Sequence, residues 1–226
     1  PDSNRQQHLQ CAKQFANEQY AGFMNQPAKC NFPISQKGRM RIGYLSADFH
    51  EHATAYLLAG VLECHDRTQV EIFAYSYGPA NTNAMRTRLE NACEVFRDIQ
   101  SFSHEDAATL IAADKIDILI DLKGFTENGR PQIIALRPAP VIVSWLGYPA
   151  TLGQRQLAYY LIGDTIVTTL SHQADYSETL ALMPHSYQPT DANRTIGPSQ
   201  TRQQAGLPDD AFIFCSFNQI FKITPD

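Results

Sequence analysis

One histidine, His52, stands at a position in the sequence that suits acid–base chemistry. It ends the stretch RIGYLSADFHEH, residues 41–52. Residues 42–46 have the alternating, β-branched character of a buried strand, and the polar run 47–51 ends that strand where a helix is expected to begin. Ligands of open α/β sheets bind beyond the carboxyl ends of the strands, and an imidazole titrates near neutral pH. The stretch therefore places His52 where it could take or give a proton.

Two further loops follow predicted strands and could share a crevice with His52. They are residues 123–126, after the apolar run 116–122, and residues 147–153, after the run 141–146. Beyond parallel strands such loops converge on one edge of the sheet. The residues expected to line the crevice are His52, Thr54, Lys123, Gly124, Tyr148, Pro149 and Thr151, and Asp121 lies on the same rim with no firm role.

The same residues also fit a purely structural interpretation. Glycine and proline shape turns wherever they occur, and a histidine that begins a helix can hydrogen-bond a nearby backbone group instead of a substrate. From the loops alone, both interpretations stay open.

The histidines at 50 and 52 form an HxH motif that could bind a divalent metal at a strand end. A metal site needs three or four ligands, and no matching His or Cys pair occurs elsewhere in the sequence, so we expect no metal. A dinucleotide site is not expected either, because Gly43 stands alone where GxGxxG would be required.

A lysine near the end of the chain, Lys222, could contact a phosphate. It lies in FNQIFKIT, residues 217–224, a few residues after a predicted buried strand. An ammonium there would add its charge to the dipole of a helix terminus, although a solvated surface lysine fits the same pattern.

Composition excludes several classes of protein. The chain has 226 residues, 43% hydrophobic and 18% charged, which is ordinary for a soluble globular protein. A net charge of -5 gives no basic field for nucleic acid, and no apolar run is long enough to span a membrane. Five cysteines are widely spaced without a CxxC motif, and the first residues lack a secretion signal, so we expect reduced thiols and a cytoplasmic location.

The pattern of elements predicts an α/β fold. An amphipathic helix over residues 5–24 and a linker over 25–38 precede alternating apolar runs and helical segments, the signature of a parallel sheet flanked by helices. Strands are predicted at residues 42–46, 70–77, 96–99, 116–122, 141–146, 160–163, 179–183 and 211–217, and helices at about 54–64, 83–93, 104–113 and 132–136. The first forty residues look like an appendage or the tail of an upstream helical region, and residues 184–198 are expected to be irregular.

Four separated blocks together resemble a known family. They are RIGYLSADFHEHATAY, LRPAPVIVSWLGYPATLG, YSETLALMPHSYQPTD and FCSFNQIFKITPD. In this order they resemble the catalytic region of the O-linked N-acetylglucosamine transferases, a bacterial and eukaryotic family often preceded by tetratricopeptide repeats. The resemblance runs from about residue 40 to the end of the chain.

The resemblance implies a GT-B architecture, in which two Rossmann-like lobes face a cleft. It also implies inverting, metal-independent transfer of N-acetylglucosamine from UDP-GlcNAc to serine or threonine hydroxyls of proteins. Residues 1–39 would then be the end of the repeat region, 40–205 the N-terminal lobe, and 206–226 the start of a C-terminal lobe that the chain does not complete. His52 would match the active-site histidine, Lys222 the lysine that neutralises the UDP diphosphate, and Gln219 the same nucleotide segment.

Three residues depart from the family pattern. Ala53 stands where proline is common after the histidine, Phe221 where a tyrosine often precedes the lysine, and Ala150 replaces a glycine. The first two could loosen the active-site loop or remove a hydroxyl contact. A binding or scaffold module derived from such an enzyme therefore stays open as an alternative, as does a hydrolase that uses the HxH motif.

Overall fold

The computed structural model describes residues 4–34, 38–80, 82–194 and 196–217. The chain divides into two compact units, residues 1–193 and 194–226, and the fold described below is that of the first unit.

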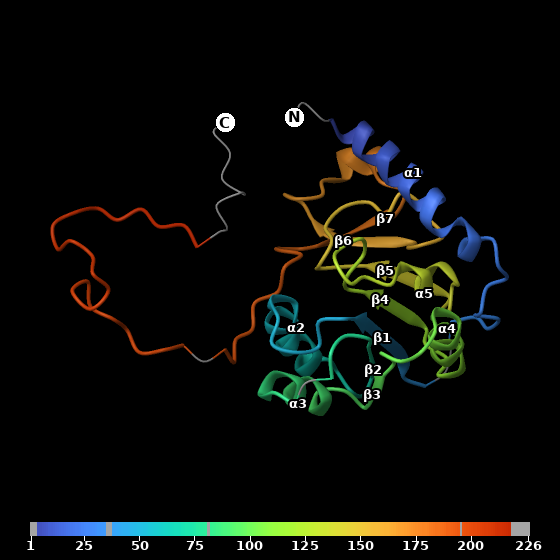
Figure 1. The fold of residues 1–226 in the computed structure, drawn as a ribbon, viewed down its shortest axis with the longest axis horizontal. Helices are drawn as coiled ribbons and strands as arrows, with labels where there is room; N and C mark the ends of the chain where they lie inside the picture. The colour runs from blue at the N-terminus through green and yellow to red at the C-terminus, as the bar shows by residue number, and fades with distance from the viewer. Residues whose placement is uncertain (1–3, 35–37, 81, 195, 218–226) are drawn as a thin grey trace. The chain divides into compact units, whose positions relative to one another are not determined.

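A parallel β-sheet forms the centre of the first unit (Figure 1). In the described residues its seven strands follow the order β3-β2-β1-β4-β5-β6-β7, and every neighbouring pair is parallel. The strands are β1 (Met40–Ser46), β2 (Val70–Ser76), β3 (Val95–Asp98), β4 (Ile118–Asp121), β5 (Val141–Ser144), β6 (Tyr160–Asp164) and β7 (Thr179–Met183). Their apolar runs are buried because helices cover both faces of the sheet. The predicted α/β fold class is confirmed.

Helices cover the two faces in separate groups (Figure 1). The helices are α1 (Arg5–Met24), α2 (Ala53–Cys64), α3 (Ala84–Asn91), α4 (His104–Ala113) and α5 (Pro131–Ala135), with a 3-10 helix η1 (Leu170–Asp175) that the sequence did not predict. One core holds α2 and α3 against the sheet, and the other holds α1, α4 and α5. Parallel strands joined by helices on both faces of the sheet form a Rossmann-like lobe.

The strand order reverses between β1 and β4. From β1 the chain proceeds to β2 and β3 on one side, and then crosses over to β4 and the remaining strands on the other. Leu45 of β1 lies opposite Asp121 of β4, so the two strands end at the same height and their following loops emerge side by side. A crevice at such a reversal is where doubly wound sheets bind ligands.

Helix α1 packs as part of this unit and is not the appendage that the sequence suggested. Its side chains Ala16, Tyr20 and Met24 are buried in the core shared with α4 and α5. Arg137 also donates a hydrogen bond of 2.6 Å to the carbonyl oxygen of Met24. The domain boundaries after residues 39 and 205 stay predictions.

The strand predicted over residues 211–217 is wrong, because the structure has no strand there. Phe212, Phe214 and Phe217 are 82%, 90% and 98% exposed. Alternating apolar residues form a strand only when a neighbour accepts their backbone hydrogen bonds and covers their side chains, and no such neighbour pairs with them within the described residues.

Candidate functional site

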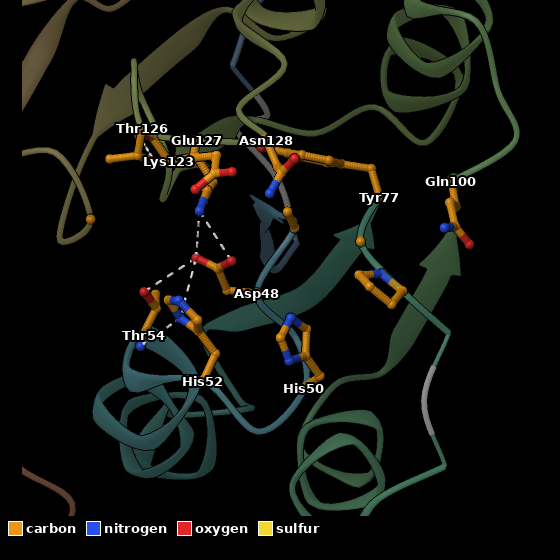
Figure 2. A pocket seen from close by; sticks show the side chains of 14 residues that line it. Asp48, His50, His52, Thr54, Tyr77, Gln100, Lys123, Thr126, Glu127 and Asn128 are labelled. Atoms are coloured by element: carbon orange, nitrogen blue, oxygen red, sulfur yellow. Dashed lines mark hydrogen bonds and ion pairs between the residues drawn. The ribbon is translucent and has the colours of Figure 1, made fainter.

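A cavity of about 720 Å³ opens at the carboxyl edge of the sheet, where the strand order reverses. The loops after β1 to β5 all contribute to its wall. Its lining residues are Ala47, Asp48, His50, His52, Thr54, Tyr77, Gly78, Pro79, Gln100, Lys123, Thr126, Glu127, Asn128 and Gly147 (Figure 2). This volume is in the range of small-molecule binding sites.

A buried ion pair joins the loop after β1 to the loop after β4. The Lys123 Nζ atom lies 3.1 Å from Asp48 Oδ1 and 3.0 Å from Asp48 Oδ2. Both side chains are more than 90% buried, so the charges compensate each other where water is scarce. Figure 2 shows the two groups facing each other across the cavity wall. The pair spans the point of strand reversal and fixes the distance between the two loops.

His52 forms the N-cap of α2 and faces the same cavity. Its Nδ1 atom accepts a 3.2 Å hydrogen bond from the backbone N–H of Thr54, and Nδ1 also lies 3.4 Å from Asp48 Oδ2 (Figure 2). The side chain is 41% exposed. The ring therefore has a structural contact, since Nδ1 caps the helix, and an exposed part that faces the cavity.

A tight turn after β4 positions Lys123. Asp121 accepts hydrogen bonds from the backbone N–H groups of Lys123 at 3.2 Å and Gly124 at 2.8 Å. Burial raises the pKa of the Asp121 carboxyl to about 6, against the lowering effect of these two N–H groups and of the Lys123 charge. Gly124 has a φ of 51°, and a Cβ there would lie 2.7 Å from that of Tyr148, so the turn requires glycine.

The structure brings some of the predicted site residues together and separates others. His52, Thr54 and Lys123 line the cavity. Tyr148 and Thr151 instead line an apolar groove of about 370 Å³ between their loop and α1, and Pro149 is exposed outside both hollows.

The separation has a local cause. Tyr148 packs on Phe125, with ring centroids 5.5 Å apart, and Thr151 donates a 2.7 Å hydrogen bond to the buried Glu178. These contacts turn both side chains away from the cavity. Gly124 serves the turn rather than the wall, and Gln219 and Lys222 lie outside the described residues.

Sequence reasoning missed several cavity residues. Asp48 was not among the predicted site residues, although it is the buried acidic group that lines the cavity. Tyr77, Gln100 and Asn128 come from loops after β2, β3 and β4, and single polar residues in such loops give no recognisable spacing. Their common signal is position, since each follows the end of a strand on the same edge.

No metal centre is found in the part of the chain that the structure describes. The rings of His50 and His52 lie 5.8 Å apart between centroids, and the described residues contain no group of three or more His, Cys, Asp or Glu side chains that could hold a metal ion. Among the same residues, no helix is both long and apolar enough to cross a membrane.

Comparisons with known proteins agree with one another. The family model of glycosyl transferase family 41 matches residues 18–197 and 192–226. A probable UDP-N-acetylglucosamine–peptide N-acetylglucosaminyltransferase SEC of Arabidopsis thaliana is 37% identical over 203 residues, which cover 86% of this chain and 21% of that protein. A UDP-N-acetylglucosamine–peptide N-acetylglucosaminyltransferase of Caenorhabditis elegans is 40% identical over 157 residues. These residues cover 69% of this chain and 14% of that protein.

A solved structure shows the same fold. A mutant O-GlcNAc transferase of Thermobaculum terrenum superposes with a TM-score of 0.76 at 31% sequence identity, over 83% of this chain and 36% of that one. The chain thus spans much less than half the length of the proteins that it matches. With the family model covering most of its length, the chain belongs to glycosyl transferase family 41.

Proposed function

We propose that this chain forms the N-terminal catalytic lobe of an enzyme that transfers N-acetylglucosamine from UDP-GlcNAc to serine or threonine hydroxyls of proteins. The observation that carries the proposal is the placement of His52, whose exposed ring faces a cavity at the strand reversal of a family 41 lobe. The relatives' names supply the donor and the peptide acceptor.

In the proposed reaction the acceptor hydroxyl attacks the anomeric carbon of the sugar, and the bond from that carbon to the diphosphate breaks. His52 accepts the hydroxyl proton, a role that suits an imidazole at neutral pH. UDP leaves with the electron pair of the broken bond, so its developing charge needs a cation. We assign that task to Lys222, with Gln219 in the same nucleotide segment, and propose that no metal takes part.

Lys123 has a different task in this proposal. Both oxygens of Asp48 already accept hydrogen bonds from its ammonium, and the pair is buried. The Lys123 charge is therefore neutralised by Asp48 and is not available to neutralise a diphosphate. We propose that Lys123 shapes the wall against which the sugar and acceptor lie.

The partners follow from the same proposal. They are protein acceptors, the sugar nucleotide and a C-terminal lobe of the same protein, with tetratricopeptide repeats before the lobe. The net charge of -5 supports a protein that binds neither nucleic acid nor an anionic membrane. The described cysteines, all free thiols, support a cytoplasmic location.

The test uses a protein that carries both lobes, radiolabelled UDP-GlcNAc and a serine-containing peptide. His52→Asn keeps a side-chain acceptor for the N–H of Thr54 but removes the base, so transfer should fall about 100-fold or more while the fold is retained. His172→Ala, on η1, is the matched control and should keep wild-type turnover. Peptide binding without any transfer by the wild-type protein would instead support a scaffold module.

A further inference from the structure

The Nδ1 atom of His52 has two neighbours that make opposite demands on it. The N–H of Thr54 donates to it at 3.2 Å, which requires a lone pair on Nδ1. Asp48 Oδ2 lies 3.4 Å away, and because a carboxylate can only accept, this contact becomes a hydrogen bond only if Nδ1 carries a proton. A neutral imidazole carries one proton, so the two contacts belong to two different tautomers.

Only one of these tautomers can act as a base toward the cavity. When Nδ1 caps α2, the proton is on Nε2 and that nitrogen has no free lone pair. When Nδ1–H faces Asp48, Nε2 has a lone pair and can accept the proton of an acceptor hydroxyl. After the transfer the ring is an imidazolium, with Nδ1–H still beside the carboxylate and the former hydroxyl proton on Nε2.

Asp48 is held firmly enough to bias this choice. Its carboxylate is buried and accepts from Lys123 Nζ on both oxygens, and the hydroxyl of Thr54 donates to Oδ2 at 3.4 Å. Its backbone N–H also donates to the Oγ of Ser46 at 2.9 Å. A fixed acceptor in surroundings with little water interacts strongly with an N–H that points at it.

We infer that Asp48 is a positioning residue that selects the base-competent tautomer of His52, and that this selection competes with the helix cap on Thr54. The inference rests on the proposed transferase function. It assigns to Asp48 an action through His52 alone, without contact to the sugar or the acceptor.

Asp48→Asn in the two-lobed protein tests the inference. The amide oxygen of the asparagine should turn to Lys123, which leaves its NH₂ group to donate to Nδ1 and holds the proton on Nε2. Turnover should then fall about 100-fold to 10,000-fold with KM changed less than about threefold, as expected when a base is held in the wrong tautomer. Nitrogen NMR of ¹⁵N-histidine-labelled protein, assigned with His52→Asn, should show a population with Nδ1–H in the wild type and none in the variant.

A double mutant separates positioning from mere stability. If Asp48 acts through His52, Asp48→Asn combined with His52→Asn should be no slower than His52→Asn alone. Multiplicative losses, or the same ring protonation in wild type and Asp48→Asn, would overturn the inference. Asp66→Asn is the matched control, because Asp66 is exposed in the turn before β2, at the opposite edge of the sheet, and both NMR signals and turnover should remain unchanged.

A second variant covers the case in which Asp48→Asn does not fold because it leaves the buried Lys123 charge unpaired. Asp48→Ala with Lys123→Met removes both charges and leaves only the N–H of Thr54 beside Nδ1. The population with a proton on Nδ1 should again vanish. Persistence of that population would refute the inference. A wild-type protein without any transfer would refute the proposed function, while the ring protonation would still decide the role of Asp48.

Discussion

His52 contributes to stability as well as to the proposed chemistry, and the two contributions can be separated. As the N-cap of α2 it accepts the N–H of Thr54, and loss of a cap costs about 1 kcal/mol. His52→Ala should therefore lower the free energy of unfolding by about 1 kcal/mol, whereas His52→Asn should leave it nearly unchanged. Urea denaturation of the two variants measures their free energies of unfolding. An equal loss of stability in both would show that the cap contributes little.

Asp121 should make stability depend on pH. Its pKa, raised to about 6 by burial, exceeds the value of 3.8 expected without burial, so the folded protein retains a proton that the unfolded chain has lost. The resulting stabilisation is complete below about pH 3.8 and disappears as the pH rises through about 6, a total of roughly 3 kcal/mol. Asp121→Asn cannot lose the proton, so relative to wild type it should gain stability between about pH 4 and pH 7.

Denaturation of both proteins across that range is the measurement. The asparagine loses one of the two acceptors for the N–H groups of Lys123 and Gly124, which lowers its stability equally at every pH. The informative quantity is therefore how the difference in the free energy of unfolding between the two proteins changes with pH. A difference that does not change with pH would mean that Asp121 titrates alike in the folded and unfolded states.

At the scale of elements, α1 and the loop after β5 pack so closely that one added methyl group should disturb their contact. Gly153 has a φ of 76°, and a Cβ there would lie 2.3 Å from the carbonyl carbon of Ala12. Gly153→Ala should therefore destabilise the unit by about 2 to 4 kcal/mol through overlap and backbone strain. Hydrogen exchange should also show α1 opening more readily, and unchanged protection of α1 would contradict the contact.

Gly22 provides the matched control within α1. Nothing lies within 4 Å of a Cβ built there, and the residue is inside the helix. Gly22→Ala should stabilise the unit by about 0.5 to 1 kcal/mol, because alanine loses less backbone freedom in a helix. If Gly22→Ala raises the free energy of unfolding and Gly153→Ala lowers it, the loss of stability at Gly153 comes from its position and not from the change to alanine itself.

The elements could be predicted from the sequence to within a residue or two because their signals are local. The apolar run at 116–122 contains β4 and the polar loop before His52 leads into α2, since burial on both faces and helix capping depend on nearby residues. The strand at 211–217 could not be judged this way, because its pattern needs a partner from elsewhere in the chain. The same limit applies to the site, because tertiary packing decides whether the Tyr148 side chain points into the cavity or packs on Phe125.

At the scale of the whole molecule, the proposed chemistry is divided between this lobe and residues beyond it. The structure places His52 in the cavity, while the proposed diphosphate contact, Lys222, lies outside the described residues. We expect the 226-residue chain alone to show no transfer and to bind UDP with a Kd weaker than about 1 mM. Isothermal titration with UDP measures this, with the two-lobed protein as control, and tight stoichiometric binding to the chain alone would contradict the expectation.

The loop after β5 connects two distant parts of this lobe. Gly147, at its start, lines the cavity, and a Cβ there would lie 2.1 Å from the carbonyl oxygen of Leu122; Gly153, at its end, abuts the backbone of α1. Leu146, just before the loop, already holds a φ of 73°, which a branched side chain rarely adopts. Because both ends of this loop are closely packed, we expect a tilt of α1 to shift these few residues and, with them, the rim of the cavity.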